Sequence, residues 1–130
     1  MYQQTTRSIK VSVRPYFLAD ESDPDANHYF WAYNVVVENE SADTVQLMSR
    51  YWNITDSNGQ VEEVAGAGVV GEQPVLEPGG SFEYTSGCPL SAPSGMMHGR
   101  YRMRASDGRE FEVDIPAFSL DLPDSQPVLN

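Results

Sequence analysis

The chain has 130 residues, 19 of them acidic and 8 basic, and its formal net charge is -11 at pH 7. This length builds one domain around a single core, and the negative charge argues against nucleic acid or an anionic membrane surface as a partner. The single cysteine, Cys88, forms no internal disulfide, residues 1–10 lack the apolar run of a signal peptide, and no stretch is apolar over a membrane-spanning length. We therefore expect one cytoplasmic domain over residues 1–122 and a flexible tail at residues 123–130.

Residues 9–17 alternate between apolar and polar side chains, a period of two that is typical of a half-buried strand. Pro15 has no N–H to donate to a ladder, so we expect this strand at a sheet edge, where pairing with a second copy would give a homodimer instead of a monomer. The next segment, residues 20–25, carries four carboxylates but lacks the spacing, central Gly and closing Glu of an EF-hand. We interpret it as a solvated loop, with a divalent metal site as the alternative.

Two long strands follow this loop. Residues 29–38 carry aromatic and β-branched side chains on both faces, which predicts a central strand. Residues 45–56 form the second strand, and the turn at residues 57–59 supplies the positive-φ positions that lead back through residues 60–64. These two segments should form a hairpin, with Trp52 in the core.

The last two strands, at residues 97–105 and 109–118, have complementary faces. Arginines alternate with apolar residues in the first, and acids alternate with apolar residues in the second. Paired residues point to the same side of a sheet, so we predict a three-residue loop at 106–108 with Gly108 in the left-handed conformation. The expected pairs are Arg104 with Glu110, Arg102 with Glu112, Arg100 with Asp114, and Met103 with Phe111.

Another short strand is expected at residues 81–85, ending before Ser86, which brings the total to seven or eight strands. Turn signals separate the strands, and no segment has a helical apolar period. This pattern predicts an all-β fold, an immunoglobulin-like antiparallel β-sandwich, with a barrel as the alternative. Because a lone cysteine cannot form the inter-sheet disulfide of antibody domains, the fibronectin type III-like variant is favoured.

A glycine-rich stretch at residues 64–84 matches the dinucleotide fingerprint G-x-G-x-x-G at positions 66–71. Prolines follow at positions 74 and 78 with no helical period, so the strand-turn-helix context of that fingerprint is missing and we reject the Rossmann reading. Two interpretations stay open. The glycines shape a kink or bulge, or their N–H groups form a nest that binds phosphate with help from arginines. The candidate ligand-binding residues are Gly66, Gly68, Gly71, Arg100 and Arg102.

Residues with catalytic chemistry are scattered through the chain. His28 and His98 lie far apart without metal-ligand spacing, and Cys88 has no base that the sequence identifies beside it. Arg50, inside a strand, has no partner that can be assigned. We therefore predict no enzyme, no cofactor and no metal centre.

Four segments resemble the ApaG family, known in bacteria as ApaG or CorD: RYW at 50–52, GAGVVGEQPVLEPGGSFEYTSG at 66–87, GMMHGRYRM at 95–103 and IPAFSL at 115–120. The resemblance covers residues 9–122, and its glycine segment has fixed spacing and unusual composition. It implies a fibronectin type III-like sandwich and a bacterial stand-alone protein. It also implies links to a diadenosine tetraphosphate hydrolase gene and to cobalt and magnesium efflux.

Similar domains in F-box proteins and in a polymerase-interacting protein imply a module for protein contacts. The leading hypothesis is therefore a non-enzymatic protein-protein interaction domain whose glycine stretch and adjoining loops present a surface to an unknown protein partner. The alternative, which some relatives suggest, is a sensor that binds pyrophosphate, ATP or a dinucleoside polyphosphate through the glycine motif.

Overall fold

The structure, a computed structural model, describes residues 1–122, so the flexible tail predicted for residues 123–130 lies outside the described residues. Within them the chain forms strands joined by turns and two single-turn 3-10 helices, η1 (Ala19–Glu21) and η2 (Pro24–Ala26). The strands are β1 (Tyr2–Thr6), β2 (Ile9–Phe17), β3 (Tyr29–Asn39), β4 (Val45–Asp56), β5 (Val61–Ala67), β6 (Val75–Leu76), β7 (Ser81–Leu90), β8 (Gly95–Ala105) and β9 (Glu110–Leu120).

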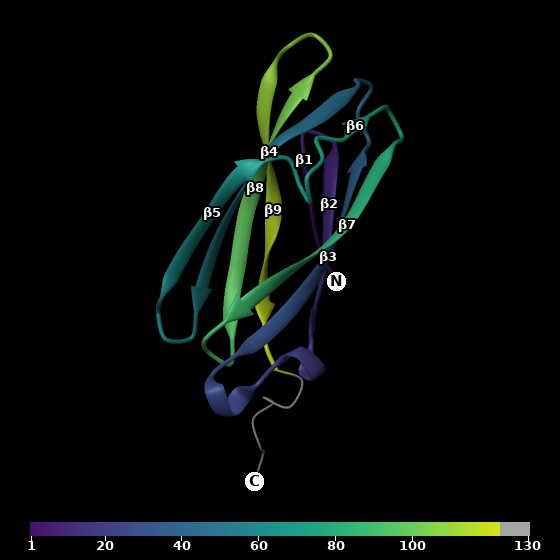
Figure 1. Cartoon of the computed structure of the whole chain (residues 1–130). Helices are drawn as coiled ribbons and strands as arrows, with labels where there is room; N and C mark the ends of the chain where they lie inside the picture. Colours follow the sequence, from purple (N-terminus) through teal and green to yellow (C-terminus); the bar gives the residue numbers. More distant parts are fainter. Residues whose placement is uncertain (123–130) are drawn as a thin grey trace.

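The strands build two antiparallel sheets packed face to face, which confirms the predicted sandwich (Figure 1). One sheet has the order β1-β2-β3-β7, and the other has the order β5-β4-β8-β9 with β6 paired to β4. Between them lies a core that includes Trp31, Trp52, Tyr101 and Phe118, all at most 2% exposed. The Trp52 and Phe118 rings meet edge to face at 5.9 Å, so the predicted core position of Trp52 is confirmed.

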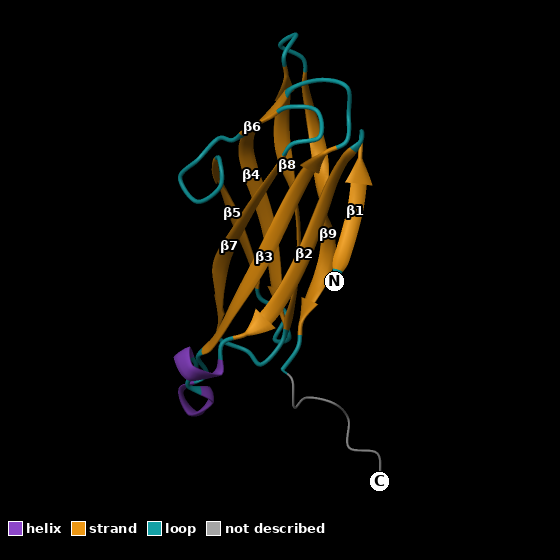
Figure 2. Ribbon diagram, turned by 90° about the vertical axis from the view of Figure 1, so that its right-hand side faces the viewer, coloured by secondary structure: helices purple, strands orange, loops and turns teal. Residues whose placement is uncertain are grey.

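The two sides of the sandwich differ. On one side β1 lies beside β9, where the Tyr2 hydroxyl is 3.2 Å from Ser119 Oγ and the Asp114 N–H donates to Thr6 Oγ1 at 3.3 Å (Figure 2). On the other side the edge strands are β5 and β7, and within residues 1–122 each of them pairs with one neighbour. Among the described residues no hydrogen bond joins β5 to β7. The sandwich is therefore closed along one side and open along the other.

Both predicted hairpins are present, and the second has the predicted register. In the β4–β5 hairpin Thr55 pairs with Val61, and Gly59 in the turn has φ 83°. In the β8–β9 hairpin Gly108 has φ 86°. The four predicted pairs are all present, namely Arg104 with Glu110, Arg102 with Glu112, Arg100 with Asp114 and Met103 with Phe111.

The prediction that residues 9–17 form an edge strand is wrong. β2 lies between β1 and β3, because the polar segment Tyr2–Thr6 forms an additional strand. That segment lacks the alternation of apolar and polar residues that would predict a strand. Pro15 is tolerated since the β1–β2 ladder ends at Val13, two residues earlier. β7 also continues past the predicted end to Leu90, and there the proline at position 89 fits an edge strand.

Candidate functional site

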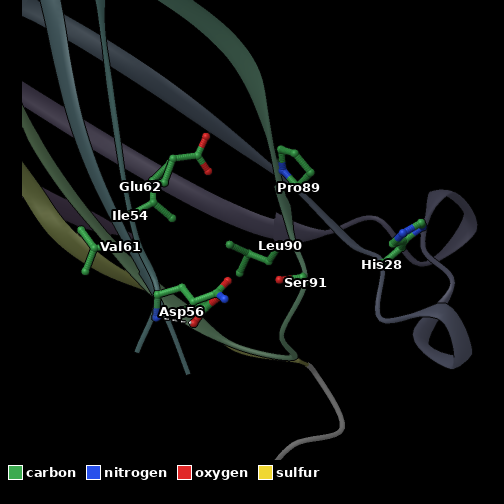
Figure 3. Close-up of a pocket in the computed structure, with 9 residues that line it drawn as sticks. His28, Ile54, Asp56, Val61, Glu62, Pro89, Leu90 and Ser91 are labelled. Atoms are coloured by element: carbon green, nitrogen blue, oxygen red, sulfur yellow. Dashed lines mark hydrogen bonds between the residues drawn. The ribbon is translucent and has the colours of Figure 1, made fainter. Parts of the chain in front are cut away.

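A groove follows the open side of the sandwich between β5 and β7. Its outer part is a hollow of about 370 Å³ between the β4–β5 hairpin and the end of β7, with His28 nearby on the η2–β3 connection (Figure 3). A second hollow of about 160 Å³ continues inward and shares Ile54, Glu62 and Pro89 with the first. The inner hollow is lined by Tyr33, Arg50, Trp52, Ile54, Glu62, Val64, Ser86, Gly87, Cys88, Pro89 and Met97.

Arg50, which the sequence left without a partner, faces this inner hollow. The β4–β8 register shifts between Leu47 and Ser49, and this bulge turns Arg50 to the same side as its fully buried neighbour Tyr101. The guanidinium crosses Gly66 on β5, where a Cβ would lie only 3.0 Å from Arg50 Nη1. Nη1 donates to the carbonyls of Ala67 at 3.1 Å and Gly68 at 3.0 Å. Gly66 therefore leaves the space that Arg50 occupies.

Three tyrosine hydroxyls lie inside the sandwich near this guanidinium. Tyr84 and Tyr101 hydrogen-bond to each other through their hydroxyls, and Tyr33 bonds Ser86. Burial raises the pKa of each tyrosine above its usual value, and the positive charge of Arg50 partly offsets that effect. All three phenols are therefore neutral at physiological pH.

Cys88, on β7, also lines the inner hollow and is 2% exposed. Burial, with a smaller contribution from the negative charge of Glu62, raises the pKa of its thiol to about 12. A nucleophilic cysteine needs the thiolate, which burial disfavours here.

Alkaline pH should destabilise the fold. These tyrosines and Cys88 have folded-state pKa values above their unfolded values, so their stabilisation is complete below the unfolded pKa and is lost as pH rises. For Cys88 the stabilisation is lost between pH 9.0, the usual pKa of the thiol, and about pH 12, its pKa in the folded state. We expect the melting temperature, followed by circular dichroism, to fall from about pH 9, and from about pH 10 in a Cys88→Ala variant. A melting temperature independent of pH up to about 11 would contradict this interpretation.

The glycine motif forms a tight turn. Gly68 has φ 62° and its N–H donates to the Met48 carbonyl, while the N–H groups of Val69 and Glu72 each donate to the other's carbonyl. Gly71 has φ 82° at the turn. No α-helix follows within the described residues, in agreement with the rejected Rossmann reading. Three of the amides around this turn are thus already hydrogen-bonded to carbonyls.

A third hollow, of about 290 Å³, lies on the outer face of the β5-β4-β8-β9 sheet and brings together Gly66, Arg100 and Arg102. Arg50 lines both this hollow and the inner hollow of the groove. Arg100 Nε lies 2.8 Å from Glu112 Oε2, and its guanidinium stacks 4.2 Å above the Tyr51 ring. The ion pair of Arg100 therefore runs diagonally to Glu112 and not to Asp114, the acid that faces it in the ladder. Arg102 makes no ion pair or side-chain hydrogen bond with the described residues.

The other two candidate ligand residues, Gly68 and Gly71, do not line this hollow. Binding of a phosphate by the five candidates remains a prediction.

The acidic segment at residues 20–25 contributes to η1 and η2. Across residues 1–122, no group of three or more His, Cys, Asp or Glu side chains has the proximity needed to hold a metal ion. His28 lines the outer hollow, whereas His98 pairs with Asn53 in the β4–β8 ladder. Helices long and apolar enough to span a membrane are likewise absent from this part of the chain.

Comparisons with known proteins identify the family. The family model described as ApaG domain matches residues 19–105. Protein ApaG of Brucella anthropi is 60% identical over 130 residues, and Protein ApaG of Brucella suis biovar 1 is 57% identical, both over the full length of each chain. The crystal structure of the ApaA protein from Bordetella pertussis is 46% identical, with a TM-score of 0.87 over 90% of this chain and 95% of that one. The chain belongs to the ApaG domain family.

Proposed function

We propose that this chain is a non-enzymatic protein-interaction domain that holds its partner along the groove between β5 and β7. The observation that carries the proposal is the open side of the sandwich, where both edge strands have an edge to which no strand of residues 1–122 is paired. Edge strands offer backbone groups to an added strand, and pockets beside them accept its side chains. Apolar surface is also available, since Val61 at the start of β5 is 59% exposed.

The chemistry of the groove supports binding without catalysis. Its titratable groups with displaced pKa values, Tyr33 and Cys88, are both shifted toward the neutral, protonated form by burial. Catalytic bases and nucleophiles need a pKa near or below the working pH. The proposed function uses no cofactor.

The link to cobalt and magnesium efflux, implied by the family resemblance, would then act through a protein partner. A cobalt-tolerance assay tests this in a bacterial strain that lacks its own ApaG protein. We expect the wild-type chain and Thr85→Trp to restore growth in Co²⁺, and Ser86→Trp to fail. Position 86 lines the inner hollow, whereas Thr85 is exposed and adjacent in the same strand. With both variants folded by circular dichroism, equal rescue would reject the groove as the functional surface.

A second candidate function is the binding of pyrophosphate or ATP in the hollow on the outer face of the β5-β4-β8-β9 sheet. This function is favoured because Gly66, Arg100 and Arg102 line the same hollow, and a guanidinium group can donate two parallel hydrogen bonds to phosphate oxygens. Backbone amide NMR during titration with pyrophosphate and with ATP, with and without Mg²⁺, tests it at low ionic strength. Saturable shifts around the hollow that disappear in Arg102→Gln would support this site. Millimolar ligand without shifts would reject it.

A further inference from the structure

Arg50 brings an unpaired positive charge to the inner end of the groove. Its Nη1 group is engaged by two carbonyl oxygens, but no carboxylate of the described residues lies within ion-pair distance of the guanidinium. The side chain is half-buried between the sheets. A guanidinium partly withdrawn from water gains most from a charged acceptor, and the remaining N–H groups are available for one.

The outer end of the groove has the opposite charge. Glu62 lines both hollows of the groove and makes no ion pair or side-chain hydrogen bond within residues 1–122. Asp56 lines the outer hollow, and its Oδ1 accepts hydrogen bonds from the N–H groups of Asn58 and Gln60. Figure 3 shows both carboxylates on the hairpin side of the hollow, opposite Pro89. From Arg50 to Asp56 the strand rises by roughly 20 Å at about 3.3 Å per residue.

Apolar side chains lie between these charges. Trp52 and Val64 pair across β4 and β5, and Ile54 follows, so a continuous apolar wall joins the two ends. Pro89 supplies the facing wall from β7. An extended peptide of about six residues matches this span, with apolar side chains against the wall and charged ones at each end.

We propose that the groove binds an extended segment of a partner protein whose Asp or Glu side chain pairs with Arg50 and whose Lys or Arg side chain, about six residues away, pairs with Glu62 and Asp56. This inference rests on the proposed function and specifies the partner's chemistry. The carboxylate replaces the counterion that Arg50 lacks, and the cation meets the free Glu62 carboxylate.

Selection from a phage library of random nine-residue peptides tests the proposal. The baits are the full chain, Arg50→Gln and, as matched control, Arg14→Gln, whose exposed arginine lies on the other sheet without an ion pair to any described residue. We expect the wild type and the control to enrich peptides that combine an acid with a Lys or Arg about six positions apart. The best peptide, made synthetically, should bind Arg50→Gln about tenfold more weakly, as expected for a charged hydrogen bond.

Two further measurements keep the test decisive. If Arg50→Gln does not fold by circular dichroism, Glu62→Gln, at an exposed position, should weaken the same peptide through its basic end. Amide NMR should place the peptide at β5 and residues 86–89. A peptide that keeps its affinity in Arg50→Gln but shifts these amides would refute the carboxylate site and leave the proposed function standing. No enrichment by the wild-type chain would overturn the inference.

Discussion

Replacing Gly68 with alanine will lower the free energy of unfolding by at least about 3 kcal/mol, whereas Gly71→Ala will lower it by only about 1 kcal/mol. Both glycines have positive φ, 62° and 82°, so both substitutions carry the left-handed strain of an L side chain. Only at Gly68 is the space also filled, since a Cβ there would lie 2.2 Å from the Glu72 carbonyl oxygen. At Gly71 nothing lies within 4 Å of the added atom.

Urea unfolding of the two variants beside the wild type measures this difference directly. The comparison separates the two costs of a side chain, because conformational strain is common to both positions and the steric clash is present at one. Equal destabilisation would mean that the turn around Val69 and Glu72 relaxes freely, and would remove the structural role of Gly68.

Asn39→Asp is expected to cost about 3–5 kcal/mol at pH 7. Asn39 is fully buried, and its Nδ2 donates to the carbonyls of Asp43 at 2.8 Å and Leu76 at 3.0 Å. Its Oδ1 accepts from the Ser41 N–H at 3.0 Å and the Ser41 hydroxyl at 2.6 Å. The aspartate keeps the oxygen that accepts from Ser41, but its second carboxylate oxygen replaces Nδ2. That oxygen faces the carbonyls of Asp43 and Leu76, which offer it no hydrogen-bond donor.

The loss of stability in Asn39→Asp should become smaller as the pH falls. Burial and the two carbonyls raise the folded-state pKa of the introduced carboxyl above its unfolded value, so protonation at low pH removes the buried charge and restores one donor. Denaturant unfolding at pH 7 and pH 5 tests this, with Asn58→Asp in the exposed 57–59 turn as a control expected to change stability by less than about 0.5 kcal/mol. A cost at Asn39 that is no larger than at Asn58 would contradict the hydrogen-bond assignment.

The parts of the fold that the sequence predicted are those with strong alternation. Arg100, Arg102 and Arg104 on one strand and three acids on the next allow one register only, because a one-residue slip would bury charge. The hairpin of β4 and β5 was predictable for a similar reason, since Gly59 marks the turn and both flanking segments favour strands.

Long-range geometry decided what the sequence did not predict. β1 is polar, and it is a strand because β2 and β9 flank it, not because of its own pattern. Arg50 faces inward because of a bulge near Met48, and the residue types around Met48 do not predict a bulge. The glycine motif suggested free N–H groups, but the amide of Gly68 donates to Met48, 20 residues earlier in the chain. Each of these features depends on which strands become neighbours.

The open side of the sandwich as the partner-binding surface is the central claim, and site-specific photo-crosslinking in living cells tests it most directly. A photo-reactive amino acid is placed at Glu62, which lines both hollows of the groove, or at Glu63, the next residue, which bonds the Tyr51 hydroxyl at 2.7 Å on the outer face. Both replacements remove one negative charge from the same strand. We predict a discrete crosslinked protein from position 62 and none from position 63, and its loss in Arg50→Gln. Crosslinks from position 63 alone, or none from either, would contradict the account.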